Sequence, residues 1–160
     1  MSDDLASQVR WLRDRELIRE LPQLYAYGID TRDFDVVASV FHPDCTVAGT
    51  MRTEGIERYL KLLEPGVRQY HATMHFMGNQ YLRVEGDAGH VETYAVAYHM
   101  EADDSSIQDL IMGVRYQDDV VRVGEEWKIS QRNVIKQWHR GPLPRPGQGQ
   151  LEAEVDDAPS

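Results

Sequence analysis

The spacing of apolar residues predicts a long helix at the start of the chain. Between residues 3 and 29, apolar side chains recur every three or four positions, as they do along one face of an α-helix. The residues on this stripe are Leu5, Val9, Trp11, Leu12, Ile18, Leu21, Tyr25 and Ile29. Pro22 lacks an amide hydrogen, so we expect either a kink there or two consecutive helices. Ser2 or Asp3 is expected to cap the first turn.

Two shorter helices and one strand follow. Helical spacing returns at residues 34–41, and His42-Pro43-Asp44 is expected to end that helix. Residues 45–50 are expected to form a short strand. A third helix is expected at 55–63, where Pro65 and Gly66 would stop it.

From residue 69 onwards the pattern is typical of β-strands. The runs are rich in Val, Ile, Tyr and Thr, and the breaks between them carry Gly, Asn and Asp. The expected strands cover residues 69–78, 79–86, 90–102, 107–123 and 127–139. Helices followed by consecutive strands are typical of an α+β fold, with helices packed on one face of an antiparallel sheet.

The last 20 residues have a different composition. Residues 141–160 are rich in proline and glycine and end in an acidic stretch. Such a segment has few groups to bury, so we expect an irregular extension or one that lies along a neighbouring subunit. A single domain is then expected over residues 1–140.

The charge balance excludes some classes of partner. The chain has 160 residues and a formal net charge of -10, with 27 acidic and 17 basic residues. Nucleic acids and anionic membranes favour clustered Lys and Arg, so neither is expected as a partner. No apolar run approaches the roughly 18 residues of a membrane-spanning helix, and no signal peptide is recognised. Cys45 is the one cysteine, so we expect a buried, unreactive thiol and a cytoplasmic location.

Two histidines share one face of the strand expected at 69–78. His71 and His75 are four residues apart, and alternate residues of a strand point to the same side. A histidine on a buried face requires partners for its ring nitrogens. A third histidine, His99, lies on a later strand beside Ala95 and Ala97, whose small side chains leave room for a packed helix or a ligand.

The end of the long helix carries further polar groups. Tyr27 and Asp30 are three residues apart, which stacks them on one side of a helix, and Tyr25 precedes them. No sequence motif for a metal site or for a glycine-rich nucleotide loop accompanies them, so neither a metal site nor a nucleotide-binding loop is expected.

Several short motifs occur in an order that resembles a known family. They are Tyr25-Ala26-x-x-x-Asp30-x-x-Asp33-Phe34-Asp35, Phe41-x-Pro43-Asp44, His75-Phe76-x-Gly78, Trp127-Lys128-Ile129 and Trp138. Together they resemble the SnoaL-like group of the nuclear transport factor 2-like superfamily, and within it scytalone dehydratase and related cofactor-independent dehydratases.

The resemblance implies a fold and an arrangement of site residues. It implies a cone-shaped, curved antiparallel sheet wrapped around the long N-terminal helix and enclosing one pocket. It implies that Asp30 pairs with His75 and that His99 supplies a second histidine. It further implies a homo-oligomer, with a trimer favoured over a dimer.

These expectations lead to a hypothesis about function. The protein would be a lyase of the dehydratase type that removes a proton next to a carbonyl. His75 would act as the base and Asp30 would orient it, while Tyr25 or Tyr27 would donate to the carbonyl oxygen. His99 would protonate the departing hydroxyl.

The residues expected to line the pocket indicate the class of ligand. They are Tyr27, Met77, Met112, Tyr116 and Trp138. Such a lining suits a small hydrophobic molecule, aromatic or steroid-like in shape. Arg115 and Arg132 are mid-strand charges, expected either in salt bridges between subunits or, for one of them, at the pocket.

Alternative functions stay open at this level. The same groups would serve an isomerase, a cyclase or a dehydrochlorinase, and the fold also suits a non-catalytic ligand-binding or structural subunit. An enzyme requires His75 and Asp30 within hydrogen-bonding reach, at an open cavity.

Overall fold

Three helices and a six-stranded sheet make up the computed structural model of this chain. The structure describes residues 2–49, 52–102 and 108–143, without the side chains of residues 2 and 3. The elements are α1 (Ser2–Thr31), α2 (Phe34–Ser39), β1 (Phe41–Ala48), β2 (Arg52–Glu54), α3 (Ile56–Arg68), β3 (Ala72–Glu85), β4 (Ala88–Met100), β5 (Leu110–Val123) and β6 (Glu126–Arg140). The expected α+β class is confirmed. The expected caps at residues 2 and 3, and the tail beyond 143, lie outside the described part.

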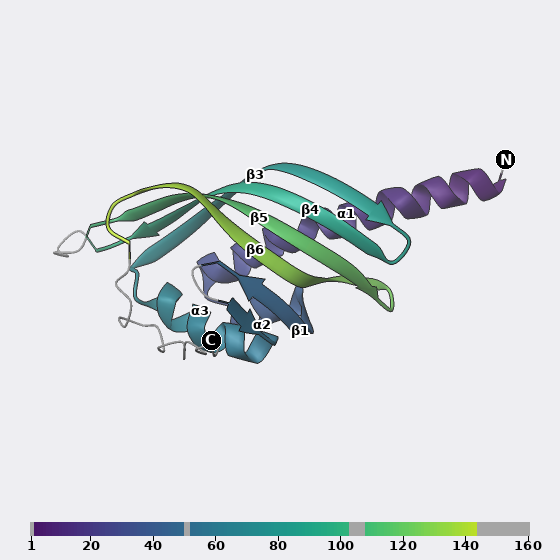
Figure 1. Ribbon diagram of the computed structural model, residues 1–160. Coiled ribbons are helices and arrows are strands. Elements are labelled where there is room, and N and C mark those ends of the chain that lie inside the picture. The colour runs from purple at the N-terminus through teal and green to yellow at the C-terminus, as the bar shows by residue number, and fades with distance from the viewer. Residues whose placement is uncertain (1, 50–51, 103–107, 144–160) are drawn as a thin grey trace, which may run out of the picture.

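The sheet is mixed and not wholly antiparallel. Its strand order is β2-β1-β6-β5-β4-β3, and β3 to β6 form an antiparallel meander. β1 pairs with β6 in parallel, and β2 pairs with β1 antiparallel. The long strands arch over α1, with α2 and α3 below them (Figure 1).

Helix α1 runs along the inner face of this arch. Its side chains of Ile18, Leu21, Tyr25 and Ile29 are at most 6% exposed and form the centre of the core. Pro22 lies inside one continuous helix of 30 residues, so the alternative of two helices is wrong. The N-terminal part of α1 projects beyond the sheet (Figure 1), which leaves the first part of the apolar stripe exposed. No helix among the described residues is long and apolar enough to cross a membrane.

A buried carboxylate anchors α1 where it meets the sheet. Asp14 accepts two hydrogen bonds from the Arg122 guanidinium, at 3.0 and 2.7 Å, and one from the Trp127 indole. The Arg122 hydrogen bonds lower the pKa of Asp14 against the opposing effect of burial, so Asp14 is charged at neutral pH. This contact joins α1 to β5 and β6.

Three expected boundaries were wrong. Helix α3 continues through Pro65 and Gly66 to Arg68, because Pro65 and Lys61 are exposed and water can satisfy the Lys61 carbonyl that loses its helical donor. The expected strands 69–78 and 79–86 are one strand, β3, with a register shift between Met77 and Gln80. Residues 42–44 lie within β1 and do not end a helix there.

Candidate active site

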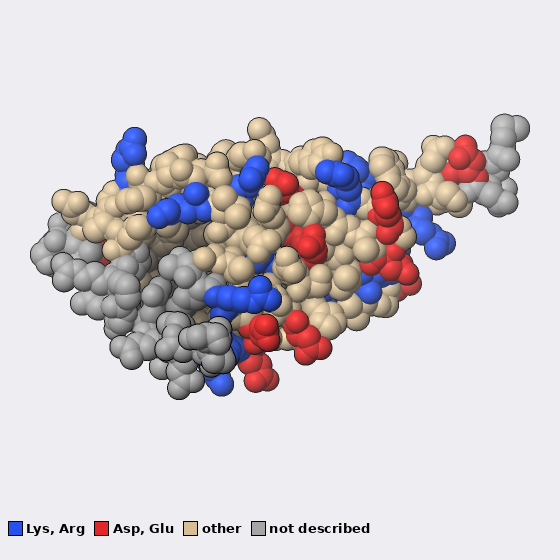
Figure 2. Space-filling model, in the orientation of Figure 1, with Lys and Arg blue, Asp and Glu red and all other residues tan. Residues whose placement is uncertain are grey.

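Three elements bring the candidate residues together on the inner side of the sheet. Asp30 lies in the last turn of α1, His75 on β3 and His99 on β4. His75 is opposite Ala97, and His99 is opposite Thr73, so the two histidines lie diagonally on the same face. Acidic and basic side chains are interspersed on the face of the molecule that Figure 2 shows.

Asp30 binds His75 through both carboxylate oxygens. Oδ1 lies 2.8 Å from His75 Nδ1, and Oδ2 accepts the His75 backbone N–H at 2.7 Å. The side chain of His75 is 5% exposed and that of Asp30 is 24% exposed. Two hydrogen bonds to one residue fix both the position and the plane of the carboxylate.

The protonation states of this pair follow from their contacts. Burial alone would raise the pKa of Asp30, but the hydrogen bonds and charge of His75 outweigh it and lower that pKa. Asp30 is therefore a carboxylate at neutral pH and can only accept. His75 Nδ1 must carry the hydrogen, which leaves the lone pair of the neutral ring on Nε2.

His99 is held in a neutral state. Its ring centroid lies 5.9 Å from that of His75 and 4.9 Å from that of Tyr70. His99 Nδ1 lies 3.2 Å from the Leu110 carbonyl oxygen, so Nδ1 donates and Nε2 is an acceptor. Burial, and then the neighbouring His75, lower the pKa of His99 to about 4. At neutral pH His99 therefore has no proton to give from Nε2.

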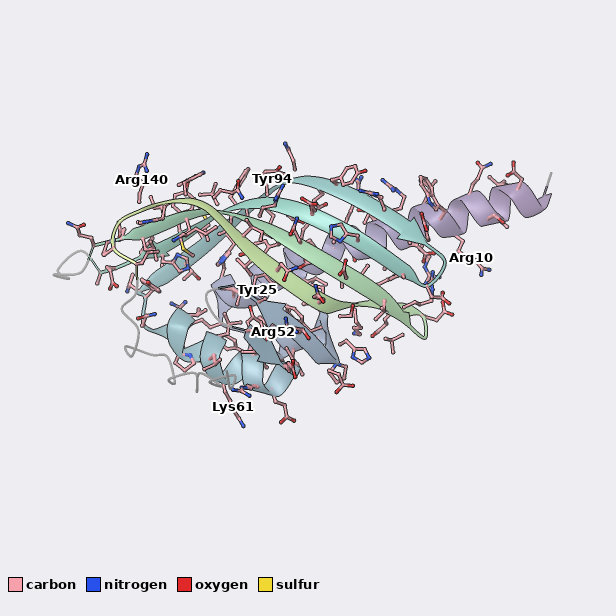
Figure 3. All side chains as sticks on the ribbon, in the orientation of Figure 1. Arg10, Tyr25, Arg52, Lys61, Tyr94 and Arg140 are labelled. Carbon is pink, nitrogen blue, oxygen red and sulfur yellow. The ribbon has the colours of Figure 1, made fainter. Side chains whose placement is uncertain are left out.

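Tyr25 approaches the pair from α1. Its ring lies edge-on to His75, with centroids 6.3 Å apart, and Figure 3 shows it below the sheet. The Tyr25 hydroxyl lies 3.1 Å from the Tyr59 hydroxyl of α3. If Tyr25 donates to a ligand, Tyr59 can donate to Tyr25 and hold its hydroxyl in place.

A buried guanidinium lies behind Tyr25. Arg132 donates to Asp118 through Nε and Nη2, both at 2.7 Å, and both side chains are fully buried. Its Cζ lies 4.2 Å from the ring centroid of Tyr25, 4.6 Å from that of Tyr116 and 5.1 Å from that of Phe41. Arg132 Nη1 is buried without a hydrogen-bond partner. The positive charge therefore lies against the candidate site and makes its pair within the chain.

Both arginines make an ion pair within the chain. Arg132 binds Asp118, and Arg115 Nη1 lies 3.4 Å from a Glu92 carboxylate oxygen of the same chain. Burial lowers the pKa of Arg132, but Asp118 outweighs burial and raises it, so Arg132 stays charged. Of the two arginines, Arg132 is the one that reaches the site.

Three of the five expected lining residues lie on the inner face. Met77 is on β3 beside His75, and Met112 is opposite Ala97 on the neighbouring strand. Tyr116 is 4% exposed and packs against Tyr25, with ring centroids 5.7 Å apart. These positions border the Asp30–His75 pair, which we call the dyad.

Tyr27 and Trp138 do not lie where the expected pocket lining would place them. Tyr27 is 60% exposed, because two residues along a helix turn the side chain about 200° away from the buried Tyr25. Trp138 pairs with Gly113 after a register shift between Gly113 and Val114, and this shift moves it to the outer face of the sheet. Its indole lies over Gly113, in space that a side chain there would occupy.

Two residues that shape the site were not predicted from the sequence. Tyr59 lies on α3, within the helix expected at 55–63, and was not predicted as a site residue. Asp118 lies on β5 at an inward position in the alternation of Val114, Tyr116 and Val120. A charged residue at such a position is the signal that would have predicted a buried ion pair. Within the residues the structure describes, no group of three or more His, Cys, Asp or Glu is placed to hold a metal ion.

Comparisons with known proteins agree with this fold. A family model described as a SnoaL-like domain matches residues 10–133. An uncharacterised protein of Mycobacterium tuberculosis is 32% identical over 129 residues, covering 78% of this chain and 86% of the relative.

Solved structures of the same fold carry enzyme names. A candidate scytalone dehydratase from Novosphingobium aromaticivorans is 23% identical, covers 91% of this chain and 94% of its own, and gives a TM-score of 0.73. The hexachlorocyclohexane dehydrochlorinase LinA-type3 from Novosphingobium barchaimii is 19% identical, covers 96% and 99%, and gives 0.75. At these identities the likeness shows the fold, and the family match over most of the chain shows that it belongs to the SnoaL-like domain family.

Proposed function

We propose that the protein is a cofactor-independent lyase of the dehydratase type. It removes a proton next to a carbonyl in an apolar, ring-containing small molecule. The observation that carries the proposal is the Asp30–His75 pair, in which a carboxylate at 2.8 Å fixes the tautomer and leaves Nε2 as a base.

Proton removal places charge where the site is prepared for it. His75 Nε2 takes the α-proton, and Asp30 stabilises the imidazolium that forms. The Tyr25 hydroxyl donates to the carbonyl oxygen as enolate charge develops, and the Arg132 guanidinium behind its ring favours that charge. General acid–base help of this kind is worth roughly 10²–10⁴-fold per group.

The leaving group takes its proton from His75. Because His99 is neutral at neutral pH, we assign it as an acceptor for a substrate hydroxyl and no longer as the acid. The proton that His75 took returns to the departing hydroxyl, the carbon–oxygen bond breaks, and the products are an unsaturated carbonyl compound and water.

Isomerisation is the second candidate. If the same proton returns to another carbon of the substrate and no group departs, the outcome is an isomer. The neutral state of His99 favours this alternative, since the site then lacks a second acid beside the dyad. Dehydrochlorination, named for a structural neighbour, and cyclisation begin with the same proton removal.

Deuterium exchange tests proton removal before the product is known. Purified protein in D2O is mixed with a panel of ring ketones that carry a β-hydroxyl, and loss of the α-proton is followed by NMR. New absorbance of a conjugated carbonyl indicates elimination, and a rearranged double bond indicates isomerisation. A ligand that binds without exchange would support a non-catalytic binding protein and contradict the proposal.

Two substitutions identify the residues responsible. His75→Ala and Asp30→Asn are expected to lower exchange by about 10²–10⁴-fold while the protein stays folded. His71→Ala is the matched control, because His71 lies before the same strand, is exposed, and is expected to leave the rate unchanged. Near-normal exchange in the His75→Ala protein would overturn the assignment.

The protein is also proposed to form a homo-oligomer, with a trimer favoured. Large apolar side chains on the outer face of the sheet support association between copies, and they are Met74, Phe76, Tyr81, Tyr94 and Trp138, each between 45% and 66% exposed. We call them the outer aromatic face. In Figure 3, Tyr94 points away from the side of the sheet where Tyr25 lies.

A further inference from the structure

Arg32 has a backbone conformation that its side chain disfavours. With φ at 58°, it is the one non-glycine residue with positive φ in the described part of the chain. It follows the end of α1, where Asp33 N–H donates to the Gly28 carbonyl and Arg32 N–H to the Ile29 carbonyl. Helices commonly end in this pattern, and glycine is the usual residue at that position. A strained residue beside a candidate site calls for a reason in its side chain.

The side chain of Arg32 supplies that reason. Its Nη2 donates to the carbonyl oxygens of Tyr70 and His71, each at 3.0 Å. These carbonyls lie immediately before β3, which begins at Ala72. The left-handed backbone turns the arginine out of the helix axis and toward this segment, whereas glycine would satisfy the backbone but make neither hydrogen bond.

We call the two hydrogen bonds from Arg32 to the Tyr70 and His71 carbonyls the Arg32 clamp. The clamp connects the two elements that carry Asp30 and His75. Arg32 is two residues after Asp30, and the carbonyls that it binds are four and five residues before His75. Apart from the Asp30–His75 pair itself, two other side-chain hydrogen bonds join α1 to β3 in the described part of the chain, from Gln80 to the Arg19 carbonyl and from Arg15 to the Leu82 carbonyl. Both lie beyond the register shift of β3, so the Arg32 clamp is the one beside His75.

The same clamp holds the wall of the site next to His99. Tyr70, whose carbonyl Arg32 binds, is 8% exposed and packs its ring 4.9 Å from that of His99. Movement of the segment at residues 70 and 71 would therefore displace both the start of β3 and a neighbour of His99.

We propose that Arg32 is a positioning residue that holds Asp30 and His75 at hydrogen-bonding distance by clamping the start of β3 to the end of α1. Its importance for catalysis rests on the proposed function, but its effect on the dyad does not. The guanidinium touches no reacting atom in this role. It acts through the geometry of the Asp30–His75 pair.

The test is the dyad itself, observed without substrate. Arg32→Gly removes the clamp and also relieves the backbone strain, so the protein is expected to fold with a Tm no lower than that of the wild type. The His75 amide, which donates to Asp30, is expected to exchange with solvent about tenfold faster or more, while the Leu82 amide on the same strand keeps its rate. The Nδ1–H proton signal of His75, protected by Asp30, is expected to broaden.

Control variants separate positioning from general stabilisation. Arg68→Gln removes an arginine whose partners are Glu64, one turn away on α3, and the ring of Phe34, and is expected to leave His75 exchange unchanged. Arg32→Lys keeps a positive donor within reach of the carbonyls and is expected to restore part of the protection. Once a substrate is known, Arg32→Gly is expected to lower kcat by about tenfold with KM nearly unchanged.

Two results would overturn the proposal. One is wild-type His75 exchange and an unchanged Nδ1–H signal in Arg32→Gly. The other is faster exchange of the His75 and Leu82 amides alike with a lowered Tm, which would show that Arg32 only stabilises the fold. Failure of the enzyme assay with His75 protection still dependent on Arg32 would count against the proposed function and not against the clamp.

Discussion

His75 and His99 differ in the group that each Nδ1 atom meets. A carboxylate accepts from His75, whereas a backbone carbonyl accepts from His99. The carboxylate can stabilise a protonated His75 ring, whereas burial keeps His99 neutral and its hydrogen bond to the carbonyl offsets only part of that effect. The division of roles therefore follows from the contacts, although the two side chains are identical.

The buried neutral state of His99 predicts a loss of stability in mild acid. The unfolded chain takes up a proton at this histidine as the pH falls through its ordinary pKa of 6.5, but the folded protein does so only near 4. The unfolded state thus binds more protons between these values, so stability falls as the pH falls. The contribution of His99 to this loss is expected to be roughly 2–3 kcal/mol.

Denaturant titrations of wild type and His99→Gln at about pH 7 and pH 4.5 check this expectation. The variant is expected to lose less unfolding free energy over that interval. Asp30 is present in both proteins, so it contributes equally to both titrations. Its pKa is lowered below 3.8, so its contribution to stability is lost mainly below that pH. Equal losses in the two proteins would contradict the neutral assignment.

The sequence predicted the dyad but not the residues that hold it in place. Alternation alone offered His71 and His75 equally, and the family resemblance favoured His75 together with Asp30. The left-handed turn at Arg32 and the second tyrosine, Tyr59, were not predicted. Both depend on contacts between segments that are more than 30 residues apart, and local patterns carry no record of such contacts.

The pairing of β5 with β6 encloses an ion pair in the core. Asp118 and Arg132 are directly opposite each other, and both are fully buried. Two ionic hydrogen bonds join the strands at that point, so the pair is part of the element interface as well as of the site. Removing one partner of such a pair leaves an uncompensated buried charge.

Asp118→Asn is therefore expected to destabilise the protein by about 3–5 kcal/mol. The double variant Asp118→Leu with Arg132→Met replaces both charges by apolar groups and is expected to recover most of that stability. Chemical denaturation measures both values. If Arg132 also favours the enolate, the double variant will be stable and yet slow, whereas equal stability of all three proteins would contradict the role of the pair.

Element types were more predictable than their ends and partners. The periodicity identified α1 and the meander of β3 to β6, but the glycine at Gly78 marks a register shift inside a strand and not a turn. Pro65 lies within a helix, for a reason that depends on which side of α3 faces water. The parallel pairing of β1 with β6 joins segments far apart in the chain, which strand propensity cannot predict.

At the scale of the whole molecule, the two faces of the sheet differ in cover. The inner face packs against α1, whereas none of the helices that the structure describes lies over the outer aromatic face (Figure 1). Its five large side chains expose on the order of 500 Å² per copy. Two copies together would bury about 1,000 Å², which is the lower limit for a specific interface. Exposed apolar area of this extent is typical of a contact surface.

Phe76→Glu is expected to shift the protein from oligomer to monomer, because a carboxylate on this face would be desolvated against apolar groups. Phe76 is 66% exposed, so the substitution leaves the core intact. Leu24→Glu is the matched control, since Leu24 is 42% exposed on α1 and lies off the outer face. Light scattering coupled to size-exclusion chromatography gives the mass of each protein and separates a trimer from a dimer. A wild-type chain that is monomeric at high concentration, or a Phe76→Glu protein that keeps the wild-type mass, would show that the outer aromatic face does not join copies of this chain.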